Sequence, residues 1–425
     1  MRLPLVLTIA LVASAFAPVE EVLKPADHVA LGKSLQSYFK ANADNKGTAK
    51  AFEELSKEIE KLDKKAKRST LSLTGDLGRA LWSSYDYAKG KVVKGKVAKE
   101  TMPAYWDEGK SKVEYAIWTP AKYDPKQAYP LLVCFPDAKQ KPDQHLMEDW
   151  MDPALREKAV LVAIPLPEEE AAWNAPDYGV TRASGTGNLF SILNPLQRNH
   201  AIDFDKVFLC GRGASVGTAL LLASRFPDRF AGVIGRSGDA IAVVGENFRN
   251  LPTLFCGAGA NANAFAETIE KLGYKNATLK ADGTEADVWA WIGVQKRVAN
   301  PTEVALWPGV PAPRRAYWIE TSWDGQGTAW LKAACDRATN TITVTGEGVT
   351  KLTVYVNDVL LDLDKPVKVV CNGTESVGTI PRNLQRTVDL AASLRNDPGK
   401  LYVSFKQFDL PPPKKDDTKA GGSGK

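Results

Sequence analysis

Apolar residues recur at helical spacing through the first part of the chain. Between about residues 27 and 88 they fall at steps of three and four, and Lys and Glu fill the intervening positions. This spacing predicts three amphipathic helices within a helical N-terminal region, residues 20–100. Asp27 is expected to cap the first helix, Leu55, Ile59 and Leu62 to lie on the inner face of the second, and residues 76–88 to form the third. Such a region could also dock a partner in the cell envelope.

The pattern changes at about residue 103 and keeps its new form as far as residue 312. Short continuous apolar runs alternate with amphipathic helical segments. The runs are residues 113–118, 131–135, 160–164, 207–210, 232–234 and 253–256. Buried parallel strands read as continuous apolar runs, and helices between them cover both faces of the sheet. Residues 103–312 are therefore expected to form an α/β domain with a mostly parallel sheet.

Residues 313–409 are β-rich, with short runs such as 341–345, 352–356 and 367–371. The pair Asn372-Gly373 suits a two-residue hairpin turn. These features predict a small antiparallel C-terminal β domain. Residues 410–425 combine proline, charge and glycine without an apolar period, which predicts a disordered tail.

The first 17 residues have the parts of a secretory signal peptide. Arg2 precedes an apolar run from Leu3 to Ala13, which ends in the small residues Ala13, Ser14 and Ala15, with Ala17 close behind. The run is shorter than the ~20 residues that cross a bilayer. We expect residues 1–17 to direct export to the periplasm or the medium, with cleavage after Ala15 and no stable membrane span. The alternative is a buried N-terminal helix.

Composition adds two limits. The 425 residues hold 55 Lys or Arg and 50 Asp or Glu, interspersed along the chain, which gives little reason to expect a nucleic-acid partner. Of the five cysteines, Cys134, Cys210 and Cys256 end apolar runs and are expected to be small buried hydrophobes. Cys335 and Cys371 fall in the C-terminal segment, where export would permit a disulfide between them.

Three segments of the middle region resemble a known family. Residues 115–135 contain YAIWTPAKYDP and YPLLVCF, residues 202–233 contain IDFDKVFLCGRGASVG and FPDRFAGV, and residues 251–259 read LPTLFCGAG. They resemble the opening strands, the nucleophile-elbow strand and helix, and the strand before the catalytic acid in secreted bacterial α/β-hydrolases of the esterase and polyhydroxybutyrate-depolymerase-like branch. The resemblance covers residues 110–300. It implies an α/β-hydrolase-like fold and a Ser, acid, His triad in that chain order.

The nucleophile position departs from the family pattern. With Gly211 as the first glycine of the G-x-S-x-G elbow, the nucleophile position holds Gly213, which has no side chain. A second frame, residues 213–217, reads G-A-S-V-G and places Ser215 in the first turn of the next helix. There the hydroxyl would cap the helix or bond its own backbone. As a nucleophile, Ser215 would need a non-standard base, for which His145 and His200 are the weak candidates.

The acid, the base and the oxyanion loop depart as well. Ala260 or Asn261 stands where the acid is expected, and Gly283 marks the region where the base is expected. No histidine follows His200, so no serine from residue 213 onward can satisfy the chain order. In the oxyanion loop, Pro136 has no N–H to donate and Asp137 would repel a developing oxyanion. The three triad positions 213, 260 and 283 are thus vacant.

Other chemistry is sparse. Asp143, His145, Glu148 and Asp149 could supply ligands to a divalent metal. The simpler interpretation is a helix start with Asp143 as its cap and acidic side chains near the N-terminal dipole. Dinucleotide and phosphate-loop fingerprints are absent from the sequence, so we expect no cofactor and no metal.

These departures predict an exported pseudoenzyme of the α/β-hydrolase fold. It would bind an unidentified ligand or envelope protein through the former active-site cleft or through the added domains. The alternative is an active secreted carboxylic-ester hydrolase that uses Ser215 with a non-standard base.

Overall fold

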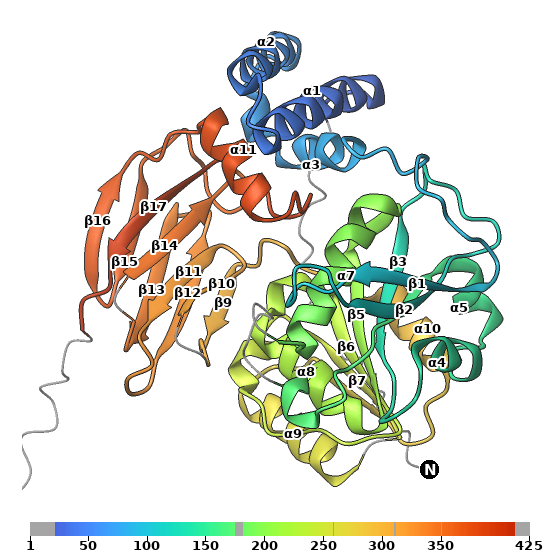
Figure 1. Ribbon diagram of the computed structural model, residues 1–425. Helices are drawn as coiled ribbons and strands as arrows, with labels where there is room; N and C mark the ends of the chain where they lie inside the picture. Colours follow the sequence, from blue (N-terminus) through green and yellow to red (C-terminus); the bar gives the residue numbers. More distant parts are fainter. Residues whose placement is uncertain (1–21, 175–181, 258, 310–311, 350, 413–425) are drawn as a thin grey trace, which may run out of the picture.

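The computed structural model describes residues 22–174, 182–257, 259–309, 312–349 and 351–412. Figure 1 shows three parts: the helices α1–α3, a large α/β part, and a β part that carries helix α11. The expected signal peptide, residues 1–17, lies outside the described residues, as does the expected tail from residue 413 onward. Within the described ranges, no helix combines the length and the apolar character needed to cross a membrane.

The N-terminal helices are α1 (Pro25–Ala43), α2 (Thr48–Ala66) and α3 (Thr74–Ser83). The expected cap at Asp27 is wrong. Helix α1 begins at Pro25, whose fixed φ suits the first helical position, so Asp27 lies inside the first turn and accepts the Lys24 N–H at 3.0 Å. The predicted inner face of α2 is confirmed by the burial of Leu55, Ile59 and Leu62.

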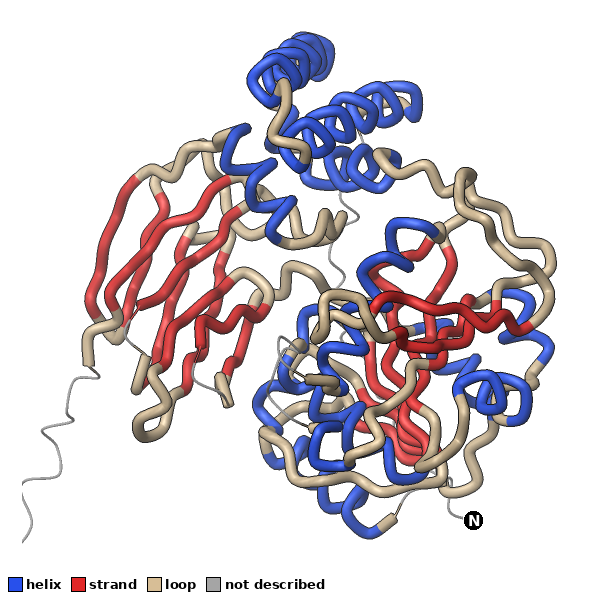
Figure 2. The backbone as a smooth tube through the Cα atoms, in the orientation of Figure 1, coloured by secondary structure: helices blue, strands red, loops and turns tan. Residues whose placement is uncertain are grey.

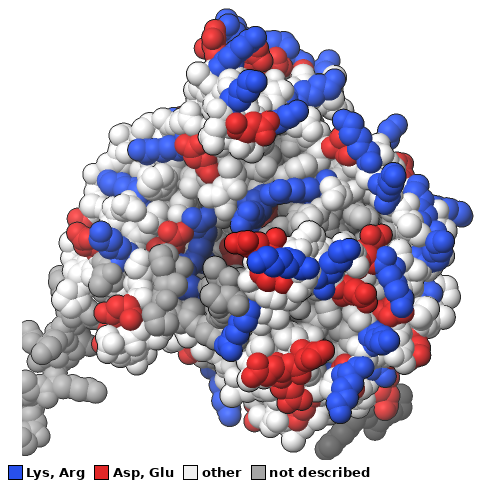
Figure 3. Space-filling model, viewed as in Figure 1, with Lys and Arg blue, Asp and Glu red and all other residues white. Residues whose placement is uncertain are grey.

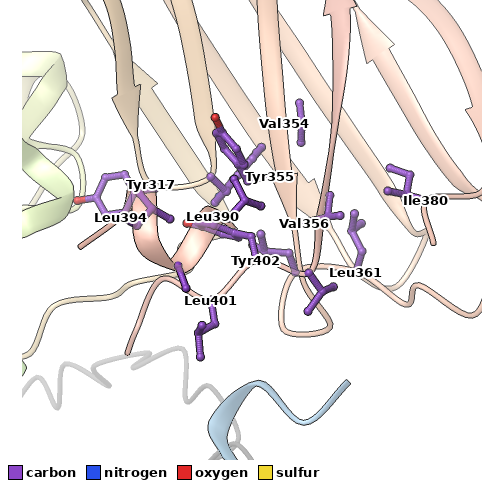
Figure 4. Packing of buried hydrophobic residues seen from close by; sticks show 14 of the residues in the cluster. Tyr317, Val354, Tyr355, Val356, Leu361, Ile380, Leu390, Leu394, Leu401 and Tyr402 are labelled. Carbon is purple, nitrogen blue, oxygen red and sulfur yellow. The ribbon is translucent and has the colours of Figure 1, made fainter. Parts of the chain in front are cut away.

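The C-terminal part of the same chain covers the apolar faces of these helices. Leu31 and Leu55 belong to one hydrophobic core with Val388 of α11 (Leu384–Ser393) and Leu401. The Tyr38 hydroxyl accepts a hydrogen bond from Gln385 at 2.8 Å. Figure 4 shows the C-terminal side of this core, where Leu390 lies beside Tyr402 and Leu394 lies near Tyr317. The apolar face of the helical region is therefore occupied by its own chain.

The central sheet has eight strands in the order β1-β2-β4-β3-β5-β6-β7-β8. The strands are β1 (Val97–Pro103), β2 (Lys112–Trp118), β3 (Tyr129–Phe135), β4 (Val160–Ala163), β5 (Ile202–Arg212), β6 (Gly232–Arg236), β7 (Thr253–Cys256) and β8 (Ala277–Lys280). β2 is antiparallel to β1 and β4, and the other pairs are parallel. All six predicted runs are strands. β1, which begins inside the expected helical region, and β8 have mostly exposed or half-buried side chains, so no apolar run marks them.

Helices cover both faces of this sheet. α7 (Gly185–Asn199), α8 (Val216–Arg225) and α9 (Ala260–Lys271) pack on one face, and α4 (Pro142–Glu148), α5 (Pro153–Lys158) and α10 (Glu285–Val294) on the other. The short α6 (Glu170–Trp173) precedes α7. Cys134 and Cys210 are buried neighbours on β3 and β5, and Cys256 is buried nearby, as expected. The predicted α/β fold class, with its mostly parallel sheet and flanking helices, is confirmed.

The C-terminal part contains two sheets, shown in red at the left of Figure 2. One joins β10 (Ala312–Ala316), β11 (Ile319–Trp323), β14 (Lys351–Val356) and β17 (Ser404–Asp409). The other joins β16 (Thr374–Gly378), β15 (Val367–Cys371), β13 (Thr341–Glu347), β12 (Trp330–Asp336) and β9 (Glu303–Leu306), which comes from the segment assigned to the middle domain.

Strand pairing in these sheets is antiparallel except between β13 and β15. The predicted hairpin turn is confirmed: Asn372 and Gly373 join β15 to β16, and both have positive φ, at 45° and 80°. Cys335 and Cys371 are free, buried thiols, and the Cys335 Sγ lies 3.0 Å from the Leu360 carbonyl oxygen.

Candidate functional site

The turn between β5 and α8 has the form of a nucleophile elbow. β5 ends at Arg212, residues 213–215 form a single 3₁₀ turn, and α8 begins at Val216. Gly213 has φ 54°, a left-handed conformation that glycine adopts at little cost. A Cβ at Gly211 would lie 2.6 Å from Val216 Cα, so only glycine permits this close approach. Gly213 therefore occupies the left-handed position of this sharp turn, and Ser215 lies at its end, directly before the first residue of α8.

The side chain of Asp137, in the loop after β3, lies over this turn. Its Oδ1 accepts the Ala138 N–H at 2.8 Å and the Ala214 N–H at 3.0 Å. In α/β-hydrolases an N–H after the nucleophile and an N–H from the loop after the third strand form the oxyanion hole. Here both donors converge on one carboxylate oxygen of the chain itself. A Cβ at Gly213 would also overlap the Asp137 carboxyl group.

Ser215 is fully buried, and backbone groups occupy its hydroxyl. The hydroxyl lies 2.8 Å from the Phe135 carbonyl oxygen and 2.9 Å from the Arg212 carbonyl oxygen, and it accepts the Arg212 N–H at 2.9 Å. It does not cap α8. In the part of the chain that the structure describes, no hydrogen bond joins Ser215 to a histidine. The hydroxyl thus ties the elbow to the end of β3.

His145 lies in α4 and is buried in a closed hydrogen-bond network. Trp150 Nε1 donates to His145 Nε2 at 3.0 Å, so this ring nitrogen is the acceptor and Nδ1 carries the proton. Nδ1 lies 3.0 Å from both Asp149 Oδ2 and Gln140 Oε1. Burial lowers the pKa of His145 to about 4, although Asp149 opposes this. The lone pair that a general base would use is therefore already taken by the indole.

Asp149 extends this network to the elbow. Its Oδ1 lies 2.8 Å from Arg212 Nη1, immediately before Gly213. The Arg236 guanidinium packs 4.4 Å from the centre of the Trp150 ring and donates to the Asp149 carbonyl oxygen at 2.5 Å. His145 and the elbow are thus connected, but through an ion pair that orients the strand ends and not through the Ser215 hydroxyl.

His200 does not belong to this site. It follows the last turn of α7, and its N–H donates to Leu196 at 2.9 Å. Its ring packs edge-on against Tyr123, and its Nδ1 has no hydrogen-bond partner among the described residues. Burial lowers its pKa to about 4. The two candidate bases therefore stand on different elements, and neither meets Ser215.

The acid and base positions are filled by packing. Ala260 is the first residue of α9, which follows β7. A Cβ at Gly283 would lie 2.5 Å from Cys256 Sγ, so that position has no room for a larger side chain. A carboxylate does lie near the acid position, but it comes from the loop after β6.

That carboxylate belongs to Asp239, which the sequence analysis missed. It accepts the N–H groups of Asn261 at 3.1 Å and Ala262 at 2.8 Å, and so closes the start of α9. Burial would raise its pKa, but these backbone bonds and that from Ala240 hold the pKa below its ordinary value. Its position directly after a buried strand was the available signal. Asp239 acts here as a helix cap supplied from another loop.

The residues weighed as metal ligands are engaged with other partners. Asp143 pairs with Lys99 at 2.7 Å, and Glu148 accepts from Gln144 at 3.1 Å. Asp143 lies inside the first turn of α4 and does not cap it, because Pro142 is the first helical residue and Lys141 precedes it. Among the described residues, no group of three His, Cys, Asp or Glu side chains is arranged to hold a metal ion.

Comparisons with known proteins give structural likeness only. No protein-family model and no curated protein matches the chain. Similar solved structures include a thermostable esterase at 15% identity, with 48% of this chain and 63% of that chain covered and a TM-score of 0.40. A ferulic acid esterase from Anaeromyces mucronatus has 15% identity, 48% and 92% coverage and a TM-score of 0.37. S-formylglutathione hydrolase from Staphylococcus aureus has 9% identity, 47% and 99% coverage and a TM-score of 0.36. This chain therefore spans less than two thirds of the length of the thermostable esterase.

Proposed function

We propose that this chain is an exported protein of the α/β-hydrolase fold that has no serine-hydrolase activity and acts by binding. The observation that carries the proposal is the Asp137 carboxylate, which accepts both N–H groups of the oxyanion hole. Because the side chain of Asp137 occupies the region where a substrate would react, we propose that the protein binds a ligand or partner and does not catalyse a reaction.

The physical argument is electrostatic. An oxyanion hole accelerates acyl transfer because its donors meet the charge that develops on the substrate oxygen, and loss of one donor costs roughly 10²–10³ in kcat. Here both donors already bond a full negative charge, which would also repel a developing oxyanion. The overlap of a Gly213 Cβ with the same carboxyl group adds a steric reason, because a nucleophile and Asp137 exclude each other.

The alternative, an esterase that uses Ser215, has less support. Its hydroxyl would have to leave the Phe135 and Arg212 carbonyl oxygens and emerge from a fully buried position. His145 would have to release the Trp150 indole to act as its base. Each step breaks a buried hydrogen bond, which costs about 1–3 kcal/mol.

A fluorophosphonate probe tests the proposal directly. The purified protein should show no serine labelling and no hydrolysis of p-nitrophenyl acetate above the buffer rate, while a known serine esterase labels in the same experiment. Ser215→Ala and Ser224→Ala form a matched pair, because both serines are buried at or near the same helix. Labelling or turnover that Ser215→Ala abolishes and Ser224→Ala retains would establish the esterase instead.

Export is proposed from residues 1–17, with a binding partner or ligand in the envelope or medium. Expression of the full chain in a bacterial host should give a mature protein that begins at Phe16, as read by intact mass. A cytoplasmic product that retains Met1 would overturn this part of the proposal.

A further inference from the structure

A cleft of about 690 Å³ lies where the α/β part meets the C-terminal β part. Its walls come from four places: the loop after β1, helix α7, the turn after α8, and the C-terminal segments around residues 314–320 and 393–400. Figure 3 shows Lys and Arg side chains at the hollow between the two parts. A volume of this size suits a small organic ligand.

The cleft is separate from the elbow turn. Gly213 and Asp137 lie beside the N-terminal end of α8, whereas Phe226 and Arg229, which line the cleft, follow its C-terminal end. Ten helical residues separate the two ends by about 15 Å. No residue of the elbow lines the cleft.

Positive charge exceeds negative charge among the described residues that line the cleft. They include five cationic side chains and two carboxylates, Asp228 and Glu320. Each carboxylate already has its own partner. Lys400 pairs with Asp228 at 2.5 Å, and Arg315 pairs with Glu320 at 2.6 Å. The other three cations, Arg229, Arg314 and Arg395, are guanidinium groups, and Arg314 donates to the Arg225 carbonyl oxygen.

Arg229 is the first of these. Among the described residues, its Nη2 alone donates hydrogen bonds, to the neutral amide oxygens of Asn194 at 3.2 Å and Gln197 at 3.3 Å. Its guanidinium carbon lies 5.2 Å from the centre of the Phe190 ring. Within the described ranges it forms no direct ion pair. Burial lowers its pKa, the charges of Asp397 and Asp228 oppose this shift, and Arg297 and Arg395 add to it. Arg229 is half-buried, and a partly desolvated cation with no carboxylate in direct contact can still gain from a further anionic partner.

Arg395 is the second. It follows α11 and is exposed, and its side chain makes no hydrogen bond or ion pair with any residue that the structure describes. It lines the same cleft as Arg229, so both guanidinium groups border one cavity. An anion held in that cavity could accept hydrogen bonds from both.

Rings and apolar groups form the rest of the wall. Phe190 and Phe226 meet edge to face with ring centres 4.7 Å apart, and Tyr105 and Leu394 also line the cleft. From the surplus guanidinium groups and this apolar wall, we propose that the cleft binds a small oxyanion, a carboxylate or a sulfonate, carried on a flat aromatic ring. The oxyanion lies between Arg229 and Arg395, and the ring packs on Phe190 and Phe226. This inference names a ligand class for the binding function proposed above and rests on it.

Calorimetric titration of the full chain with 2-naphthoate tests the inference, with neutral 2-naphthalenemethanol as the matched probe. Naphthoate should bind at least tenfold more tightly than the alcohol. Arg229→Gln and Arg395→Gln should each weaken naphthoate binding about tenfold and leave the affinity for the alcohol unchanged. Lys64 is an exposed residue on α2 and does not line the cleft. Lys64→Gln, which also removes one positive charge, is the control and should bind naphthoate as the parent does.

Several outcomes overturn the inference. They are equal binding of acid and alcohol, no binding at millimolar naphthoate, or the same loss in Lys64→Gln as in the cleft variants. If Arg229→Gln fails to fold, the exposed Arg395→Gln still decides the matter. If the protein hydrolyses esters but binds naphthoate through Arg395, the proposed lack of catalysis is wrong and the cleft site stands. If it neither hydrolyses esters nor binds naphthoate, the cleft site is wrong and the proposed lack of catalysis stands.

Discussion

At the elbow turn, the Asp137 carboxylate is matched by two backbone N–H groups of its own chain, and the His145 ring is matched on both nitrogens. At the interdomain cleft, neither Arg229 nor Arg395 forms an ion pair with a carboxylate among the described residues. A ligand at the elbow turn would gain little interaction energy, because it must first displace the internal partners of these polar groups. An anionic ligand in the cleft would gain more, because cations there exceed carboxylates. The family resemblance would place a functional site at the elbow turn. The guanidinium groups without an ion-pair partner instead favour the cleft as the binding site.

The largest effect is expected at the floor of the cleft, where Lys400 and Asp228 form a buried ion pair. Lys400→Met leaves the Asp228 carboxylate buried without its cation and should lower the free energy of unfolding by about 3–5 kcal/mol. Urea titration measures this loss. The double variant Asp228→Asn/Lys400→Met should recover at least half of it. A change below ~1 kcal/mol in the single variant would mean that the cleft floor does not depend on the pair.

Gly213→Ser tests how tightly the elbow is closed. A side chain there meets the Asp137 carboxylate and adopts a left-handed φ, so the variant should lose about 2–5 kcal/mol of stability. Asp137→Gly in the same chain removes the overlap and should restore at least 1 kcal/mol. Full stability of Gly213→Ser alone would show that Asp137 moves aside freely, which would weaken the contrast with the cleft.

The buried histidines predict a pH dependence. The pKa of His145 is lowered by burial to about 4, so between pH 6.5 and 4 the unfolded chain binds a proton that the folded chain does not. Stability should therefore rise with pH through this window, and His145 alone accounts for roughly 3 kcal/mol lost at pH 4. His200 acts in the same direction. NMR titration of the imidazole protons checks this, and an apparent pKa near 6.5 for His145 would refute it.

Ser215→Ala should give the smallest change. It removes a hydroxyl that joins β3 to the elbow, so the expected loss is about 1–3 kcal/mol in urea. Binding of 2-naphthoate in the cleft should remain as in the parent. A variant that is as stable as the parent would show that the Phe135 contact contributes nothing.

The buried helices and strands could be predicted from the sequence, but the contacts between segments far apart in the chain could not. Every strand with a continuous apolar run was predictable, whereas β1 and β8 lie at the sheet edges with half-exposed side chains and gave no signal. The sharp turn at Gly213 was predictable from the glycine spacing. The position of the Asp137 carboxylate over that turn was not, because it depends on the fold of the loop after β3. The cleft could not be predicted from the sequence, since Arg229 and Arg395 come to line it only after segments about 170 residues apart pack together.

One core joins the first helices to the last helix, and this has a consequence for the order of folding. α2 ends at residue 66, and its apolar face packs in the core that α11, from residue 384, completes. At about 5–20 residues per second, a ribosome adds the intervening chain in roughly 15–60 s. Throughout that interval Leu55, Ile59 and Leu62 lack their final cover. In a chain that ends before residue 384, this apolar face of α2 stays exposed, where chaperones, proteases or other copies of the chain can bind it.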